Sequence, residues 1–199
     1  MAYVTSEEML LDAQKRGYAV GAFNCENMEM VKAIIAAAEE LRAPVMLQTT
    51  PSTVKYGTLA TFSALVQAEA KSATVPVCLH LDHGSSYELA VEAMEEGYSS
   101  VMIDRSGLPF EENIAVTPEV VEQARAKGIP VEAELGKVGG KEDDLEVEED
   151  TNTDPSMAKE FAERTGVQSL AVAIGTAHGF YAKTPVLDKE RLSQIREVV

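Results

Sequence analysis

Short apolar runs alternate with amphipathic segments through most of the chain, and this alternation limits the folds that the chain can adopt. The apolar runs, which we expect to be strands, span residues 18–23, 43–49, 75–81, 99–104, 129–135 and 167–175. Segments with a helical period follow each of them, and a leading helix is expected over residues 5–17. Strands joined through helices pair in parallel, so the pattern predicts an α/β fold with a helix-covered parallel sheet. No linker or change of composition divides residues 1–199, which predicts one domain.

The charge balance argues against two classes of partner. The chain has 17 Lys and Arg residues against 33 Asp and Glu residues, a net charge of −16. Nucleic acids and anionic membranes bind basic faces, so we expect neither as a partner, whereas a small phosphorylated ligand needs only local donors. The two cysteines, Cys25 and Cys78, lack the spacing of a metal or redox motif. The first residues do not resemble a signal peptide and no apolar run approaches the roughly 20 residues of a membrane span, so we expect a cytoplasmic location.

One connection differs from the others. Residues 136–154 join an expected strand to an expected helix and carry seven acidic residues between Glu142 and Asp150. Such a segment is either a solvated acidic loop or a lid over a functional site, because long loops in compact domains are often functional. The sequence leaves both interpretations open.

Polar residues gather where the expected strands end. The carboxyl ends of parallel strands lie at one edge of a sheet, where the sites of α/β proteins form. The residues at or just after these ends include Asn24, Thr50, Asp82, His83, Asp104, Glu134 and His178. The opposite ends carry turn residues instead. This asymmetry predicts an active site at the carboxyl edge of the sheet.

Two histidines at this edge suggest a metal. Neutral imidazole is the commonest protein ligand of zinc, and His83 and His178 both follow a strand end. With Asp104 and Glu134 beside them, they suit a divalent metal. Asp82, next to His83, could then act as general acid or base.

Structural roles are the alternative for these residues. A histidine at a strand end can serve only as a hydrogen-bonding group, and Asp82 can close the strand with an Asx turn. His80 shares a strand face with Asp82 and can serve only to orient it. Gly84 is expected to allow a tight turn, and Ser85 or Ser86 to cap the next helix.

Five stretches of the chain resemble the class II, zinc-dependent ketose-bisphosphate aldolases. They are HLDHGSS, SVMIDRS, PFEENI, VEAELGKVGGKEDD and LAVAIGTAHGFY, and they occur in that family's order over essentially the whole chain. GTAHGFYAKTP and TTPSTVKYGT are more similar to the tagatose-bisphosphate branch than to the fructose-bisphosphate branch. The resemblance implies a (β/α)8 TIM barrel, of which this chain carries about six βα units and the leading helix.

The resemblance also implies an activity. Members of the family cleave a ketose 1,6-bisphosphate, tagatose or fructose, reversibly to dihydroxyacetone phosphate and glyceraldehyde 3-phosphate through a zinc-stabilised enediolate. Cleavage leaves a carbanion beside a carbonyl, and a Lewis acid stabilises that charge. The implied cofactor is Zn2+, with a second divalent or a monovalent cation as a further option. The implied partners are the phosphorylated sugar and further copies of the chain in a dimer or tetramer, or a companion subunit.

Roles for the metal site follow from the same resemblance. His83 and His178 match zinc ligands, and Asp104 and Glu134 match carboxylates that hold the metal in an alternative position. Asp82 matches the proton donor to the C4 oxygen.

Other positions match substrate contacts. Glu142 matches the acid that moves the proton on the dihydroxyacetone phosphate carbon. Asn24, Thr50, Gly179 and Lys183 match contacts to the substrate or its phosphates.

The family pattern contains parts that these 199 residues do not include. It has a third zinc histidine at the end of a seventh strand, and phosphate loops after strands seven and eight. The three histidines here already have other positions in the pattern, so we expect the sequence to be the N-terminal part of an aldolase barrel. A non-catalytic aldolase-like subunit or fragment, and another metal-dependent TIM-barrel enzyme, are the alternatives.

Overall fold

The computed structural model describes residues 2–142, 145–147, 151–181 and 184–199, with the backbone alone for residues 141–142 and 145–147. The helices are α1 (Ser6–Arg16), α2 (Met28–Leu41), α3 (Pro51–Gly57), α4 (Leu59–Ala70), α5 (Tyr87–Glu95), α6 (Phe110–Lys127), α7 (Pro155–Thr165) and α8 (Lys189–Val198). The strands are β1 (Gly21–Asn24), β2 (Val45–Thr49), β3 (Val77–Leu81), β4 (Ser100–Ile103), β5 (Val131–Leu135), β6 (Gly139–Glu142), β7 (Leu145–Val147), β8 (Ser169–Val172) and β9 (Ala177–His178). No helix in the described part of the chain combines the length and the apolar composition that crossing a membrane requires.

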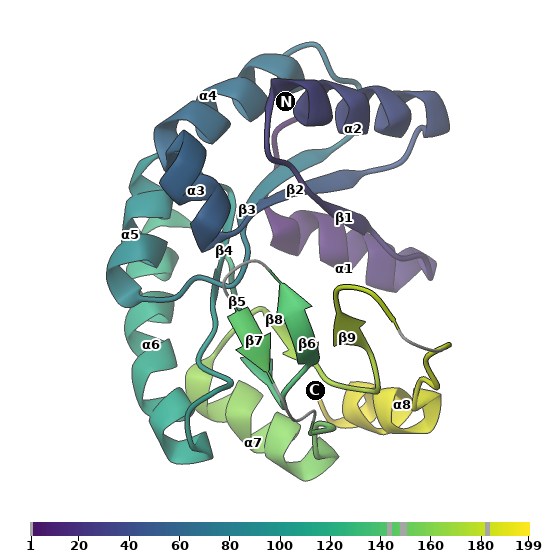
Figure 1. Ribbon diagram of the computed structural model, residues 1–199, viewed down its shortest axis with the longest axis vertical. Helices are drawn as coiled ribbons and strands as arrows, with labels where there is room; N and C mark the ends of the chain where they lie inside the picture. The colour runs from purple at the N-terminus through teal and green to yellow at the C-terminus, as the bar shows by residue number, and fades with distance from the viewer. Residues whose placement is uncertain (1, 143–144, 148–150, 182–183) are drawn as a thin grey trace.

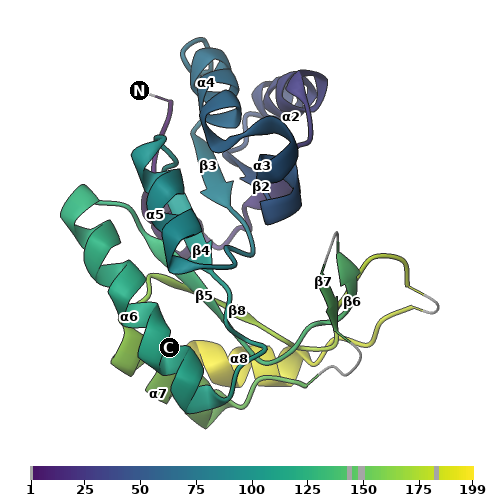
Figure 2. The ribbon, with the colours of Figure 1, turned by 60° about the vertical axis from the view of Figure 1, so that its left-hand side comes forward.

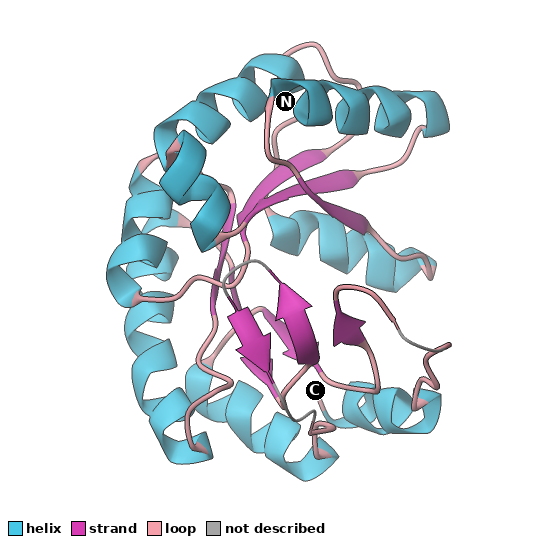
Figure 3. Ribbon diagram, viewed as in Figure 1, coloured by secondary structure: helices cyan, strands magenta, loops and turns pink. Residues whose placement is uncertain are grey.

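Six parallel strands form the larger sheet, in the order β1-β2-β3-β4-β5-β8. Helices α2 to α7 follow its outer side in an arc (Figure 1), and Figure 3 shows the same alternation by element type. The sheet is therefore a half-barrel of about six βα units, part of a TIM-barrel-like fold. This arrangement confirms the predicted α/β class and the predicted order of strands and helices.

The two faces of the larger sheet differ because side chains alternate along each strand. In β3, Val77, Leu79 and Leu81 face the helices and belong to the main apolar core. Cys78 and His80 alternate with them and point to the opposite face, which we call the inner face. The outer face is therefore largely apolar, whereas the inner face can carry polar groups.

Helix α1 covers the amino-terminal part of the inner face. Met9 of α1 packs with Met46 and Cys78 in a small second core. Nearby, Ser100 Oγ donates to Ser6 Oγ at 2.8 Å. Because α1 covers this end, the inner face can form a site only toward the carboxyl ends of the strands.

Three segments differ from the sequence prediction. α6 begins at Phe110 instead of residue 117, because Pro118 is accommodated inside the helix and the PFEENI stretch forms its first turns. α3 was not predicted, although Thr50 caps it and Pro51 occupies its first turn. The acidic connection contains the antiparallel pair β6–β7, and β6 also pairs in parallel with β9. Figure 2 shows β6 and β7 on the side of the larger sheet away from α5 and α6.

Ser86 lies between the turn after β3 and helix α5. Its side chain accepts a hydrogen bond from Leu89 N at 3.1 Å and caps α5, as predicted. Ser86→Ala should lower the free energy of unfolding by about 1 kcal/mol, because it removes this cap. Ser86→Thr keeps the hydroxyl and should retain most of the stability. Urea unfolding tests this, and an alanine variant as stable as the wild type would contradict it.

Candidate active site

The turn after β3 places Asp82 and His83 through its backbone geometry. His83 has a φ of 48°, in the left-handed region that residues other than glycine rarely adopt. Gly84 follows, and a Cβ there would lie 2.0 Å from the carbonyl oxygen of Met102. The predicted tight turn is therefore present, but the positive φ falls on His83. Glycine is needed at position 84 because the chain after β3 passes against β4.

His83, Asp104 and Glu134 come together at this edge of the sheet. One potential ligand atom from each lies within 4.8 Å of the others. His83 Nδ1 is 2.7 Å from Asp104 Oδ2, and Asp104 Oδ1 accepts hydrogen bonds from Ser106 N and Oγ at 3.0 and 2.7 Å. His83 and Glu134 are 7% and 5% exposed, so the group is largely shielded from water. The three residues come from three neighbouring strands, as the sequence predicts.

The two carboxylates of this group have opposite pKa shifts. Burial alone would raise the pKa of Asp104, but hydrogen bonds from His83 and Ser106 outweigh it, and the pKa is lowered. Burial raises the pKa of Glu134 to about 7, and the nearby charge of Asp104 adds to this rise. A buried pair of like charges is costly unless a cation or a proton compensates it. The group is therefore arranged to accept a positive charge.

His178 approaches the group from β9. The pairing of Gly140 with His178 holds β9 against β6, and the His178 ring lies 5.2 Å from the His83 ring, at 71° to it. Both histidines line a cavity of about 510 Å3, together with Asp82 and Glu134. The strand pairing thus brings three of the four predicted metal ligands and the predicted proton donor Asp82 to one cavity, with Asp104 directly behind His83.

Two further polar residues line this cavity, although neither was predicted from the sequence as a site residue. Glu132 and Gln48 line it from the inner face of β5 and β2. Glu132 shares its strand face with Glu134 because the two are two residues apart, and this spacing was the available signal. Burial raises the pKa of Glu132 to about 7, and the charges of Asp82 and Glu134 add to it.

His80 lies beneath the cavity and is fully buried. Its Nδ1 is 2.7 Å from Ser100 Oγ, and its Nε2 is 3.7 Å from a Glu132 oxygen and has no hydrogen-bond partner among the described residues. Burial, and then the nearby His83, lower the pKa of His80 to about 3. The ring is therefore neutral, which suits the predicted supporting role.

The predicted substrate contacts are placed in different ways. Asn24 ends β1 and lines the cavity. Thr50 is buried and caps α3, with its Oγ1 3.0 Å from Thr53 Oγ1. Gly179 follows β9 with a φ of 75°. Glu142 ends β6, but its side chain lies outside the described part of the chain, as does the whole of Lys183.

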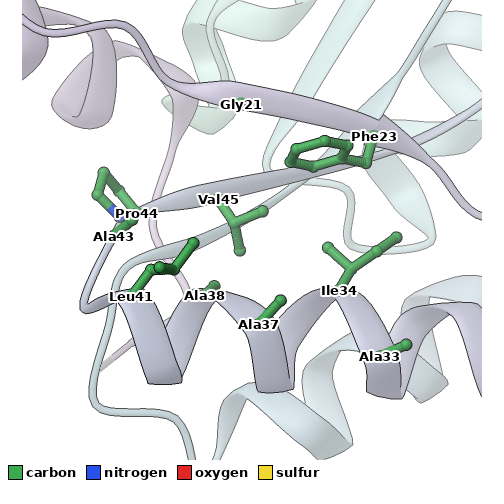
Figure 4. Close-up of a pocket in the computed structure, with 10 residues that line it drawn as sticks. All are labelled: Gly21, Phe23, Ala33, Ile34, Ala37, Ala38, Leu41, Ala43, Pro44 and Val45. Carbon is green, nitrogen blue, oxygen red and sulfur yellow. The ribbon is translucent and has the colours of Figure 1, made fainter.

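A second cavity, of about 450 Å3, lies at the β1 edge of the sheet and has a different character. Figure 4 shows Phe23, Ile34 and Val45 turned toward one another across it, with Leu41 and Pro44 at one end. All of its lining residues are apolar or glycine. It offers no group for acid–base or metal chemistry, so Asp82 and the two cavity-lining histidines belong to the polar cavity and not to this one.

The half-barrel and its group of histidines and carboxylates are typical of a TIM-barrel enzyme with a candidate metal site at the carboxyl ends of its strands. The family model for class II fructose-bisphosphate aldolases matches residues 4–199, and the chain belongs to this family. It is therefore a class II aldolase, a lyase of carbohydrate metabolism.

Solved structures agree with this assignment. The YdjI aldolase from Escherichia coli K12 is 40% identical, with a TM-score of 0.88, over 99% of this chain and 70% of that chain. A proposed fructose-1,6-bisphosphate aldolase from Coccidioides immitis is 35% identical, with a TM-score of 0.89, over 96% of this chain and 68% of that chain. Fructose-bisphosphate aldolase from Campylobacter jejuni is 24% identical, with a TM-score of 0.80 over 98% of this chain and 65% of that chain, and supports the fold alone.

The close approach at Gly84 yields a paired prediction. Gly84→Ala should lower the free energy of unfolding by about 1–3 kcal/mol, because its methyl group would overlap the Met102 carbonyl oxygen. Gly107→Ala, in the loop after β4, is the control, since a Cβ there meets nothing within 4 Å. Thermal unfolding of both variants tests this. Equal stability of the two would show that the contact at Gly84 is unimportant.

Glu132 should make stability depend on pH. Its pKa rises from 4.5 to about 7 in the folded state, so its contribution to stability is present below pH 4.5 and is lost as the pH rises toward 7. Glu132→Gln removes this titration. Without added metal, the wild type should therefore lose stability relative to the variant as the pH rises across this range.

Urea unfolding at several pH values measures the difference between the two proteins. The titration of His80 is common to both and cancels to a first approximation. A difference that stays constant with pH would contradict the prediction.

Proposed function

We propose that this aldolase cleaves a ketose 1,6-bisphosphate, tagatose or fructose, reversibly to dihydroxyacetone phosphate and glyceraldehyde 3-phosphate with the help of zinc. The observation that carries the proposal is the meeting of His83, Asp104 and Glu134 within 4.8 Å, beside a cavity that Asp82 also lines. The cytoplasmic location remains an expectation from the sequence pattern, and the dimeric or tetrameric assembly an expectation from the family resemblance.

The residues present fit a zinc ion. Imidazole nitrogen and carboxylate oxygen are both zinc ligands, and His83, Asp104 and Glu134 offer one such atom each. His178, whose ring lies 5.2 Å from that of His83, would supply a further nitrogen. When bound, the ion supplies a Lewis acid that stabilises negative charge on the oxygens of the sugar.

Asp82 is the proposed acid–base residue. Its backbone N–H donates to the Thr49 carbonyl at 2.9 Å, which holds it at the end of the β2–β3 ladder. From there it lines the cavity next to His83, and we assign to it the proton exchanged with the C4 oxygen. We assign to Glu142 the transfer of the proton on the dihydroxyacetone phosphate carbon.

The cavity wall supports a polyhydroxylated substrate. Asn24 and Gln48, at or near the ends of β1 and β2, present amide groups that both donate and accept hydrogen bonds. We assign them to sugar hydroxyls. Thr50, Gly179 and Lys183 remain the proposed contacts to the rest of the substrate and its phosphates.

Activity measurements with chelation test the proposal. With the seventh and eighth strands of the family pattern added, the protein should cleave fructose or tagatose 1,6-bisphosphate in a coupled assay, lose that activity on exhaustive chelation and regain it with Zn2+. Asp82→Asn should lower kcat by about 100-fold or more, because general acid–base catalysis contributes this much. Asp12→Asn, on the far helix α1, is the control and should leave kcat unchanged.

Two results would contradict the proposal. One is a zinc-loaded protein that contains the seventh and eighth strands and still cleaves neither sugar bisphosphate. The other is cleavage that persists after chelation and in the Asp82→Asn variant.

A further inference from the structure

The hydrogen-bonded ladder between β4 and β5 stops one residue before Glu134. The pairing runs from Val101 with Val131 to Ile103 with Ala133. Asp104, the next residue after β4, directs its N–H to the β3 side, where it donates to the Gly84 carbonyl at 3.0 Å, and its carboxylate meets His83. Val101 N donates to the Pro130 carbonyl, so by alternation the donor for the Glu134 carbonyl would be Arg105 N, which lies beyond the end of the ladder.

The carbonyl of Glu134 points toward this interrupted side. Val131 directs its carbonyl to the opposite side of β5, where Gln168 N donates to it at 2.9 Å. Successive carbonyls of a strand alternate in direction, so the Glu134 carbonyl, three residues later, faces the β4 side. It needs a donor from elsewhere, because buried carbonyl groups are almost always paired.

Asn113 supplies that donor from α6. Its Nδ2 donates to the Glu134 carbonyl at 3.0 Å, and the residue is 1% exposed. Thr117, one turn further along α6 and fully buried, donates from Oγ1 to the Asn113 carbonyl at 2.8 Å. Asn113 belongs to the PFEENI stretch, whose two glutamates are exposed. The buried polar member of that stretch thus contacts the backbone of a residue of the metal group.

We propose that Asn113 is a positioning residue of the metal site: its amide replaces the missing β4 donor and holds the end of β5 so that Glu134 stays beside Asp104 and His83. The inference rests on the proposed metal function. The carboxylates of Asp104 and Glu134 repel each other when both are ionised. The end of β5 is paired with β8 on one side, at Glu134 with Ala171, but not with β4 on the other. The Asn113 hydrogen bond holds this unpaired side and opposes movement of Glu134 away from Asp104.

Binding of Co2+, a spectroscopically visible probe of divalent metal sites, tests the proposal. Asn113→Asp keeps the shape but replaces the donor with an oxygen, and Asn113→Ser shortens the side chain without adding charge. Both should bind Co2+ at least about tenfold more weakly than the wild type, with an altered visible absorption spectrum, because a supporting hydrogen bond orients the ligand. The spectrum reports ligand geometry, which a purely structural role would leave unchanged.

Thr165→Val is the matched control. Thr165 is buried in α7 and its hydroxyl donates to the Phe161 carbonyl at 2.7 Å, which is also a buried bond from a side chain to a backbone carbonyl. This bond lies within α7 and does not involve a residue of the metal group. This variant should lose stability in urea but keep the wild-type affinity and spectrum.

The possible outcomes separate the two proposals. A folded Asn113 variant with wild-type affinity and spectrum would overturn the positioning role alone. If only one variant folds, its affinity and spectrum decide, and loss of folding in both would assign the bond to the fold and reject the positioning role. A wild-type chain that binds no Co2+ would overturn the metal site itself.

Discussion

The parallel pairing of six strands is the constraint on which the rest of this structure depends. It requires a connection, here a helix, between consecutive strands. The outer face of the sheet packs against these helices and is therefore largely apolar. It also brings every carboxyl end to one edge, where His83, Asp104 and Glu134 arrive from three neighbouring strands. With α1 against the amino-terminal part of the inner face, the polar cavity has one place to form. The chemistry is therefore a consequence of strand direction.

The edge that holds the site departs locally from regular structure. His83 takes a positive φ, Gly84 passes against the Met102 carbonyl, and the β4–β5 ladder stops before Asp104 and Glu134. These departures accompany the approach of His83 and Asp104, and the end of the ladder leaves the Glu134 carbonyl without a β4 donor. Hydrogen bonds from other elements, such as that of Asn113 to Glu134, compensate for these losses. A place where a side chain replaces a ladder hydrogen bond therefore indicates a functional site nearby.

Much of the fold and of the site follows from local sequence patterns. Strand order, the edge that holds Asp82, His83 and Asp104, and the approach of His178 are all predictable, because they depend on strand direction and on position along the chain. The start of α6 was missed because Pro118 is a helix-start signal that tertiary packing overrides. Glu132 and Asn113 were missed for another reason. Their importance lies in partners on other elements, which a single sequence does not specify.

The central claim is that imidazole and carboxylate groups at the strand ends form a zinc site. X-ray absorption of the zinc-loaded chain tests it most directly. The account predicts nitrogen and oxygen neighbours at about 2.0–2.1 Å, with the outer-shell pattern of imidazole, and a weaker imidazole pattern in His83→Ala, which leaves His178. Sulfur neighbours at about 2.3 Å would instead place the ion at Cys25 or Cys78 and contradict the claim.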